Sequence, residues 1–256
     1  MNPRYYTVIV LALLLSACAE LGIPERGAPI LSRPATNGGI YEGSISLPNG
    51  ESTTVAVVAL DSGETRIVAA NGMQMSVNFS GPANRLRGEG LLFASNTSTK
   101  PADRVLADGS GVAPVSIDAV IAPGISIQGS YSSRGGTGRF NGRYLKLYER
   151  DANLAKLAGT YRSYKQGSSF VGSIDRAGRL SGNDERGIYD GQLSVISPNI
   201  NVYRAQVTYR PSGQAPFTVT GLATLNDLEK NGDEDLLQMQ LSNQERHFFS
   251  QIRRVR

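Results

Sequence analysis

The sequence predicts an all-β protein with two tandem small antiparallel up-and-down β-barrel or sandwich domains. Two observations support this fold class. Apolar and polar side chains alternate over short segments, which is typical of strands that bury one face. Gly, Asn-Gly, Ser-Gly or Pro interrupts these segments at short intervals, which is typical of tight hairpins. The 256 residues include 29 glycines and no tryptophan, so we expect many turns and no large aromatic anchor.

The first half of the chain is expected to form eight strands. Turn sequences separate several of them, namely Pro48-Asn49-Gly50, Asp61-Ser62-Gly63, Asn71-Gly72 and Gly135-Gly136. Their glycines can adopt the positive φ angles that tight hairpins require. The expected strands cover residues 39–47, 53–60, 64–70, 73–79, 85–94, 115–121, 125–132 and 139–148.

A second series of eight strands is expected in the other half. The alternation is clearest over 217–225 and 237–241, where every second side chain is apolar and would face a core. The expected strands cover residues 160–164, 168–175, 179–183, 188–196, 201–210, 217–225, 235–241 and 247–255.

The two halves resemble each other when they are aligned, which predicts an internal repeat. Gly39-Ile40-Tyr41 matches Gly159-Thr160-Tyr161, and the turn at 60–63 matches the turn at 174–178. Further matches join 125–129 to 217–221 and 144–148 to 236–241. Two meanders of independent origin are the alternative. Each half has about 100–115 residues, which suits a small barrel or sandwich.

A helical connector is expected between the halves, over residues 149–159. Asp151 could cap its start, and Gly159 could end it. The apolar residues Leu154, Leu157 and Ala158 would then plug the end of one barrel or brace one barrel against the other.

The N-terminus has the features of a targeting segment. Arg4 precedes an apolar run at residues 8–15, and small residues follow. The run is far shorter than the ~20 residues that a membrane-spanning helix needs. Leu15-Ser16-Ala17-Cys18 resembles the lipobox of bacterial lipoproteins. The resemblance implies cleavage before Cys18, diacylglycerol on its sulfur and an acylated amine. An ordinary signal peptide that leaves a free thiol is the alternative.

Several acyl chains give stable anchoring, so the resemblance implies that the mature chain is held at a membrane through Cys18. Ala19 follows, rather than the aspartate associated with inner-membrane retention in this class, so the outer membrane is expected and the inner membrane is the alternative. Prolines at 24, 29 and 34 then predict a flexible tether. A strand-like segment that packs on the following domain is the alternative.

These observations divide the chain into four parts. Residues 1–17 are the expected lipoprotein signal peptide, and 18–37 are the lipidated cysteine with its tether. Residues 38–150 form the first β-domain, and 151–256 form the second. The strand-turn pattern over 159–226 resembles small β-rich lipoproteins of proteobacterial envelopes. That resemblance supports the fold and the compartment, and it carries no catalytic residues.

The sequence contains no credible catalytic set, and we predict no cofactor-binding or metal-ligating residues. His247 is the only histidine and is interpreted as a satisfied or surface residue. The acidic stretch 227–235 has oxygen ligands at alternate positions, but Gln238 stands where a calcium loop needs a bidentate carboxylate. A solvated hairpin turn is the preferred interpretation.

The composition is that of a mildly basic globular chain, with a formal net charge of +4. Arginines alternate with tyrosines, as in Tyr203-Arg204 and Tyr209-Arg210, and these are interpreted as the solvent face of strands. The lipobox excludes a nucleic-acid partner. We therefore expect a non-catalytic, lipid-anchored envelope protein that faces the periplasm or cell surface and acts as an interaction or assembly accessory. Its partner would be an envelope protein or an anionic glycan.

Two other classes of function remain open at this stage. A lipocalin-like carrier would bind a small apolar ligand inside a barrel, although eight strands in about 100 residues leave little interior room. An enzyme of unrecognised type is the third hypothesis. An apolar cavity larger than about 300 Å³ would favour the carrier.

Overall fold

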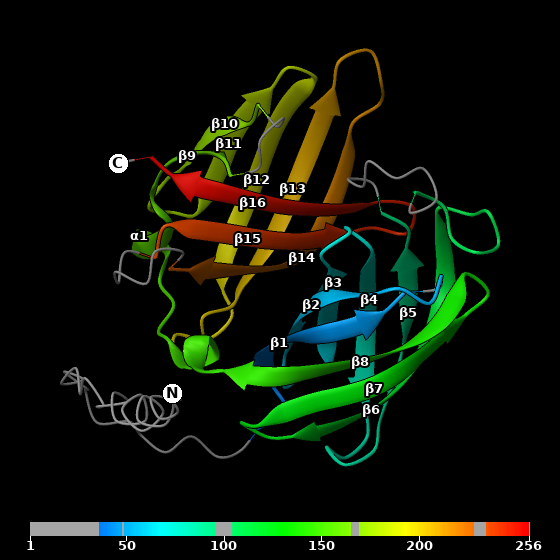
Figure 1. The fold of residues 1–256 in the computed structure, drawn as a ribbon. Helices are drawn as coiled ribbons and strands as arrows, with labels where there is room; N and C mark the ends of the chain where they lie inside the picture. Colours follow the sequence, from blue (N-terminus) through cyan, green and yellow to red (C-terminus); the bar gives the residue numbers. More distant parts are fainter. Residues whose placement is uncertain (1–35, 48, 96–103, 165–168, 228–233, 256) are drawn as a thin grey trace, which may run out of the picture. The chain divides into compact units, whose positions relative to one another are not determined.

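The computed structural model describes residues 36–47, 49–95, 104–164, 169–227 and 234–255 (Figure 1). These residues belong to one compact unit, Ala35–Arg256. Within the described residues the chain forms two antiparallel, closed eight-stranded β-barrels, one after the other. The predicted fold class is therefore confirmed, and the up-and-down barrel rather than the sandwich is the form that the chain adopts.

Barrel 1 closes because its first strand pairs with its last. Ile40 lies opposite Leu145, and each strand between them pairs with the next along the chain. The strands are β1 (Gly39–Ser46), β2 (Ser52–Ala59), β3 (Glu64–Ala69), β4 (Gln74–Ser80), β5 (Leu86–Phe93), β6 (Val112–Ala122), β7 (Ser126–Ser133) and β8 (Gly136–Leu145).

Barrel 2 repeats this arrangement in the same strand order. It closes where β16 pairs with β9, with Arg254 opposite Tyr161. The strands are β9 (Gly159–Ser163), β10 (Val171–Ile174), β11 (Arg179–Asp184), β12 (Gly187–Val195), β13 (Tyr203–Pro211), β14 (Phe217–Asn226), β15 (Leu236–Ser242) and β16 (His247–Arg254).

The predicted glycine turns join the strands of barrel 1. Gly50, Gly63, Gly72 and Gly136 all have positive φ angles, between 84° and 130°. Gly63 has a further reason to be glycine, because a Cβ there would lie 2.1 Å from the carbonyl oxygen of Phe79. These hairpins fix the register, so alternate side chains enter the barrel and the others face outward.

Side chains fill both barrel interiors. Every strand contributes at least one buried apolar residue to the core of its own barrel. In barrel 1 these include Tyr41, Val57, Ile67, Met75, Leu92, Ile117, Ile127 and Phe140. In barrel 2 they include Tyr161, Ile174, Leu180, Leu193, Tyr203, Ala223, Leu237 and Ile252.

The connector between the barrels differs from the predicted helix. A short 3-10 helix, η2, spans Lys146–Glu149, where the end of the last strand of the first half and the first residue of the helix were expected. The α-helix is shorter than expected, because α1 spans only Leu154–Leu157, and its N-cap is Asn153 rather than Asp151. The Asn153 side chain accepts a hydrogen bond from the Lys156 amide, 3.0 Å away, which is the usual capping contact.

The other end of α1 also differs from the prediction. Ala158 is the C-cap, and Gly159 instead opens β9. The predicted plug is confirmed for Leu157, which is fully buried in the core of barrel 2, and for Leu154, which packs against that core. The helix therefore covers one end of barrel 2.

The internal repeat is confirmed in strand order, but two of the predicted matches were wrong. Gly39-Ile40-Tyr41 and Gly159-Thr160-Tyr161 open the equivalent strands β1 and β9. The match of 125–129 to 217–221 sets β7 against β14. The match of 144–148 to 236–241 sets the C-terminal end of β8 against β15. Strand order instead makes β15 equivalent to β7 and β16 equivalent to β8, so those matches were one strand out of step.

Candidate functional site

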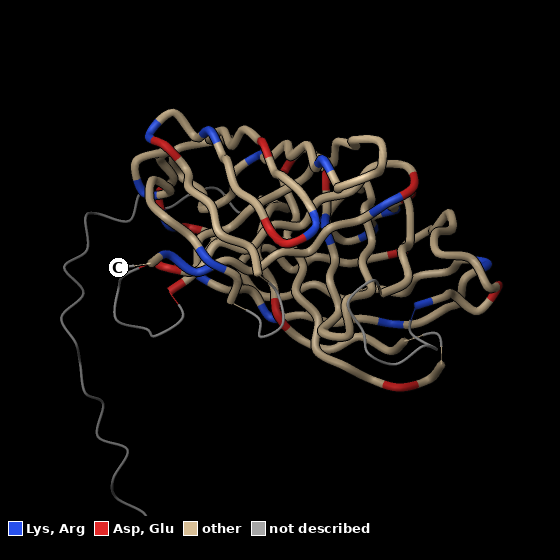
Figure 2. Tube along the Cα trace, turned by 90° about the horizontal axis from the view of Figure 1, so that it is seen from above, with Lys and Arg blue, Asp and Glu red and all other residues tan. Residues whose placement is uncertain are grey.

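The predicted lipidation site, Cys18, and the proline-rich tether up to residue 35 lie outside the described residues. In the described chain, the places where a site could lie are the barrels, their contact and the connector. Charged residues of both signs are interspersed along the chain (Figure 2). Among the described residues, Arg66 and Asp235 are the charged side chains that are buried.

An apolar cluster joins the two barrels. It combines outward-facing residues of β1 and β2 with residues of the connector and of barrel 2, all at most 5% exposed. Because these side chains lie outside both barrel cores, their burial depends on contact between the barrels. The cluster contains Ile40, Val58, Leu60, Tyr148, Ile200, Val202 and Leu222.

Polar residues extend this contact. The Gln74 amide of β4 donates to the Leu241 carbonyl of β15 at 3.3 Å. Glu64 of β3 pairs with Arg204 of β13 at 2.7 Å and with Arg66 at 3.0 Å. Burial lowers the pKa of Arg66, while the Glu64 carboxylate opposes that shift. Arg66 and Gln74 are buried in this contact, whereas Arg204 is half exposed, so the polar contact combines buried and solvent-facing partners.

His247 lies in the same contact between the barrels. It opens β16, and its Nε2–H donates to the Gly72 carbonyl oxygen of barrel 1 at 3.2 Å. Its ring centroid lies 5.2 Å from that of Phe93. Burial lowers its pKa to about 4, against the effect of the hydrogen bond to Gly72. The imidazole is therefore neutral near pH 7 and holds the barrels together.

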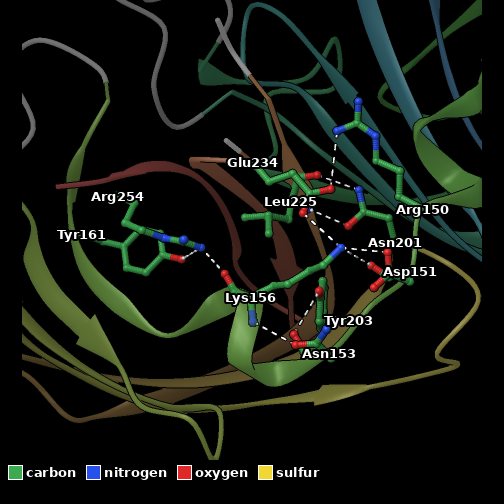
Figure 3. Close-up of polar contacts among 10 residues, drawn as sticks. All are labelled: Arg150, Asp151, Asn153, Lys156, Tyr161, Asn201, Tyr203, Leu225, Glu234 and Arg254. Carbon is green, nitrogen blue, oxygen red and sulfur yellow. Dashed lines mark hydrogen bonds and ion pairs between the residues drawn. The ribbon is translucent and has the colours of Figure 1, made fainter. Parts of the chain in front are cut away.

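The connector forms a polar network at the α1 end of barrel 2 (Figure 3). The Lys156 ammonium lies 2.8 Å from Asp151 and 3.3 Å from Glu234. Arg150 approaches the other oxygen of Glu234 at 3.5 Å. Burial lowers the pKa of Lys156, but the hydrogen bond to Asp151 and the charge of Glu234 outweigh it and raise the pKa overall. Asp151 is thus an ion-pair partner and not the helix cap.

Two tyrosines and an arginine close the same end of the barrel (Figure 3). Tyr161 donates to the Leu157 carbonyl at 2.7 Å, and Tyr203 donates to the Asn153 carbonyl at 3.4 Å. The Arg254 guanidinium donates to the Lys156 carbonyl. These contacts tie both ends of α1 to strands of the barrel, so the network has a structural role.

The acidic stretch 227–235 lies mainly outside the described residues, which include only 227, 234 and 235 of it. Glu234 pairs with Arg150 and Lys156, and Asp235 pairs with Arg253 at 2.7 Å. These carboxylates already neutralise cations of the chain. Within the described residues, no group of three or more His, Cys, Asp or Glu side chains could hold a metal ion.

The opposite end of barrel 2 carries an aromatic cluster. Tyr189 stacks on Tyr209 with ring centroids 4.4 Å apart, and it also contacts the rings of Phe170 and Phe248. The Tyr189 hydroxyl donates to Asp184 at 2.7 Å. Burial, followed by this hydrogen bond, raises the pKa of Tyr189. The rings pack on one another and fill this end of the barrel.

In barrel 1, the end equivalent to the one that α1 covers in barrel 2 holds a pocket of about 220 Å³. Its apolar lining includes Leu60, Phe79 and Ile121, and Asp61 lies at the same site. Ligand sites usually have volumes of about 300–1,000 Å³. The pocket is therefore smaller than the apolar cavity that the carrier hypothesis requires.

Two larger grooves lie on the outer faces of the barrels. A groove of about 540 Å³ crosses the β5–β8 face of barrel 1, and one of about 750 Å³ crosses the β9–β12 face of barrel 2. Arg85, Arg139 and Asp118 line the first groove, whereas the second contains the carboxylates of Asp184, Glu185 and Asp190. The linings of the two grooves therefore differ in charge.

Sequence reasoning missed the contact between the barrels. Its polar residues, such as Gln74 and Arg204, lie on the outward face of strands whose side chains alternate. Residues on such a face are normally expected to be exposed to solvent. A signal was nevertheless present in the continuous apolar run Val57-Val58-Ala59-Leu60 and in Leu91-Leu92-Phe93, which lack the polar outward residue of a half-buried strand. Val58 and Phe93 are the outward residues that this contact buries.

No family model, curated protein or solved structure matches this chain. Among the described residues, no helix is long and apolar enough to cross a membrane.

Proposed function

We propose that this protein is a non-catalytic, lipid-anchored envelope protein that acts as an interaction or assembly accessory. The lipobox resemblance at Cys18 supports an anchor at the outer membrane, with the barrels in the periplasm or at the cell surface. The partner would be an envelope protein or an anionic glycan, bound on the outer faces of the barrels.

The observation that carries this proposal is the way in which the chain uses its apolar side chains. One set fills each barrel, and a third set joins the two barrels into one unit. A filled barrel offers its outer surface for binding rather than its interior. A fixed pair of barrels also presents two outer faces at once, as an assembly accessory would require.

The carrier remains a second candidate because of the pocket in barrel 1. Leu60, Phe79 and Ile121 line it together with the polar residues Asn37, Asp61 and Ser80, so it suits a small molecule with both apolar and polar groups. Its volume of about 220 Å³ favours a ligand much smaller than the fatty acids or steroids of roomy carriers. Mass spectrometry of the protein under native conditions after extraction from cells tests this candidate. A stoichiometric apolar adduct would favour it.

The anchor is tested by labelling cells with palmitate and comparing the wild type with Cys18→Ala. The chain has no other cysteine, so no second thiol can take up the label. We expect label in the wild-type protein and none in Cys18→Ala. An unlabelled mature wild-type protein would contradict the anchor.

The partner is tested by crosslinking in intact cells, followed by affinity recovery of the full chain. We expect the wild type to recover a specific partner, at a higher yield than Cys18→Ala, because anchoring concentrates the barrels at the membrane. Equal expression of both forms is the control. A wild-type protein that reaches the envelope and crosslinks to no specific protein or glycan would contradict the interaction function.

A further inference from the structure

The groove on barrel 1 is built from two parallel rows of outward side chains. Asp118, Ser130 and Arg139 lie side by side across β6, β7 and β8. Val120, Gln128 and Asn141 form the next row across the same strands. Arg85, just before β5, lines the same groove of about 540 Å³. The groove therefore spans three neighbouring strands, or roughly 10 Å at ordinary strand spacing.

The groove carries an excess of positive charge. Among its lining residues, Arg85 and Arg139 outnumber Asp118, whose carboxylate also lies 3.7 Å from the exposed Arg87. Arg85 and Arg139 are exposed, and within the described chain neither guanidinium has an ion-pair partner. A guanidinium presents paired donors that match a carboxylate or phosphate. The two arginines thus make the groove complementary to an anionic ligand.

The remaining side chains of the groove are suited to hydroxyl groups. Gln128 and Asn84 offer amides, and Ser130 offers a hydroxyl. The Asn141 amide donates to Ser44 at 3.0 Å, which leaves its carbonyl oxygen to accept. Val120 is the large apolar residue exposed in the groove, at 39%. The lining contains no Trp or Tyr, two of the three residue types enriched among protein–protein hot spots, so we take its amides and hydroxyls as favouring sugar.

We propose that this groove binds an acidic polysaccharide chain, with Arg85 and Arg139 on its charged groups and the amides and hydroxyls on its sugar hydroxyls. A linear chain can lie along a concave groove, whereas a flat membrane surface cannot enter it. The inference rests on the proposed function, because it names the partner of the interaction module. Binding in solution does not require the anchor, so the two proposals fail independently.

Barrel 2 supplies an internal control. Its outer groove contains Glu185 and Asp190 rather than two arginines, and Asp190 already pairs with Arg210. Arg162 and Arg179 are exposed arginines on the outer face of barrel 2, outside either groove. Replacing them changes the net charge as much as replacing Arg85 and Arg139 does.

The test measures binding of the purified full chain in detergent to fluorescent oligogalacturonate, a linear carboxylated glycan. We expect Arg85→Gln/Arg139→Gln to weaken binding about fivefold, as the loss of two exposed ion pairs implies. Arg162→Gln/Arg179→Gln should bind as the wild type does. Added salt should weaken wild-type binding, because it screens exposed charges. Arg85→Lys/Arg139→Lys should restore part of the affinity by keeping the charge.

Four comparisons decide the outcome. Unchanged circular dichroism and melting of the variants show that all of them fold. Neutral malto-oligosaccharide and polyglutamate should not bind. Equal weakening in both double variants would overturn the proposal, because binding would then follow net charge alone. Absent oligogalacturonate binding, or equal binding of polyglutamate, would overturn the assignment to a glycan.

Discussion

The two barrels share a strand plan but differ at equivalent ends. Tyr41 of β1 and Tyr161 of β9 occupy the same place in the repeat, and both are fully buried. In barrel 2 the helix α1 covers the end, and Tyr161 donates to the Leu157 carbonyl at 2.7 Å. In barrel 1 the same end holds the pocket of about 220 Å³, and the Tyr41 hydroxyl has no hydrogen-bond partner in the described chain. The helix α1 thus completes the end of barrel 2, whereas the described residues leave a pocket at the equivalent end of barrel 1.

The largest expected effect concerns the cores that the barrels have in common. Leu92→Ala in barrel 1 and Leu237→Ala in barrel 2 should each lower the free energy of unfolding by about 2–5 kcal/mol, since both side chains are fully buried. The shared apolar cluster predicts one cooperative transition in calorimetry, which either substitution lowers. Val120→Ala, at an exposed site, is the matched control. Two transitions, each sensitive to one substitution, would show that the barrels unfold separately.

The second effect is a dependence of the barrel contact on pH. Burial lowers the pKa of His247 to about 4, against 6.5 as the ordinary value. The unfolded chain therefore binds more protons between these values, so the contribution is complete above about pH 6.5 and is lost as the pH falls towards 4. This difference in pKa corresponds to about 3 kcal/mol of folding stability.

Urea unfolding of the wild type and of His247→Gln at several pH values measures this contribution. The glutamine amide can still donate to the Gly72 carbonyl but does not titrate in this range. We expect the variant to lose less stability than the wild type between pH 7 and pH 4. An identical loss in both proteins would exclude His247 as the source.

The smallest expected effect compares the two barrel ends directly. Tyr161→Phe removes the hydrogen bond to the Leu157 carbonyl and should cost about 1 kcal/mol. Tyr41→Phe removes a buried hydroxyl that has no hydrogen-bond partner in the described chain, so it should be neutral or slightly stabilising. Thermal melting of both variants gives the comparison. Equal destabilisation would contradict the difference between the two ends.

Much of the fold was accessible from sequence because its signals are local. The period-two pattern over 217–225 corresponds to β14, and the glycine turns at 63 and 72 end strands where expected. The interior register follows from the same alternation. Strand β6 begins at Val112, three residues before the predicted start, and ends one residue after the predicted end. The early start was missed because Pro114 lies there and proline is unusual inside a strand.

The contacts between distant residues were not accessible in this way. Asp151 was the expected helix cap because a short acidic residue precedes the apolar positions, but Asn153 caps the helix and Asp151 pairs with Lys156. Gln74 and Arg204 have the pattern of surface residues, yet each reaches across to the other barrel. The groove on barrel 1 depends on Arg85 and Arg139, which are separated in sequence and line one groove because β5, β6, β7 and β8 pair in order.

The closing pairs also set the order in which the chain can fold. Ile40 pairs with Leu145, roughly 100 residues later, so β1 must wait for β8 before barrel 1 has its last ladder. Pairings between residues so distant in sequence form slowly. Until they form, both strands present free edges that other chains can join. A chain delivered to its compartment from its N-terminus would therefore be most prone to aggregation in the interval before β8 arrives.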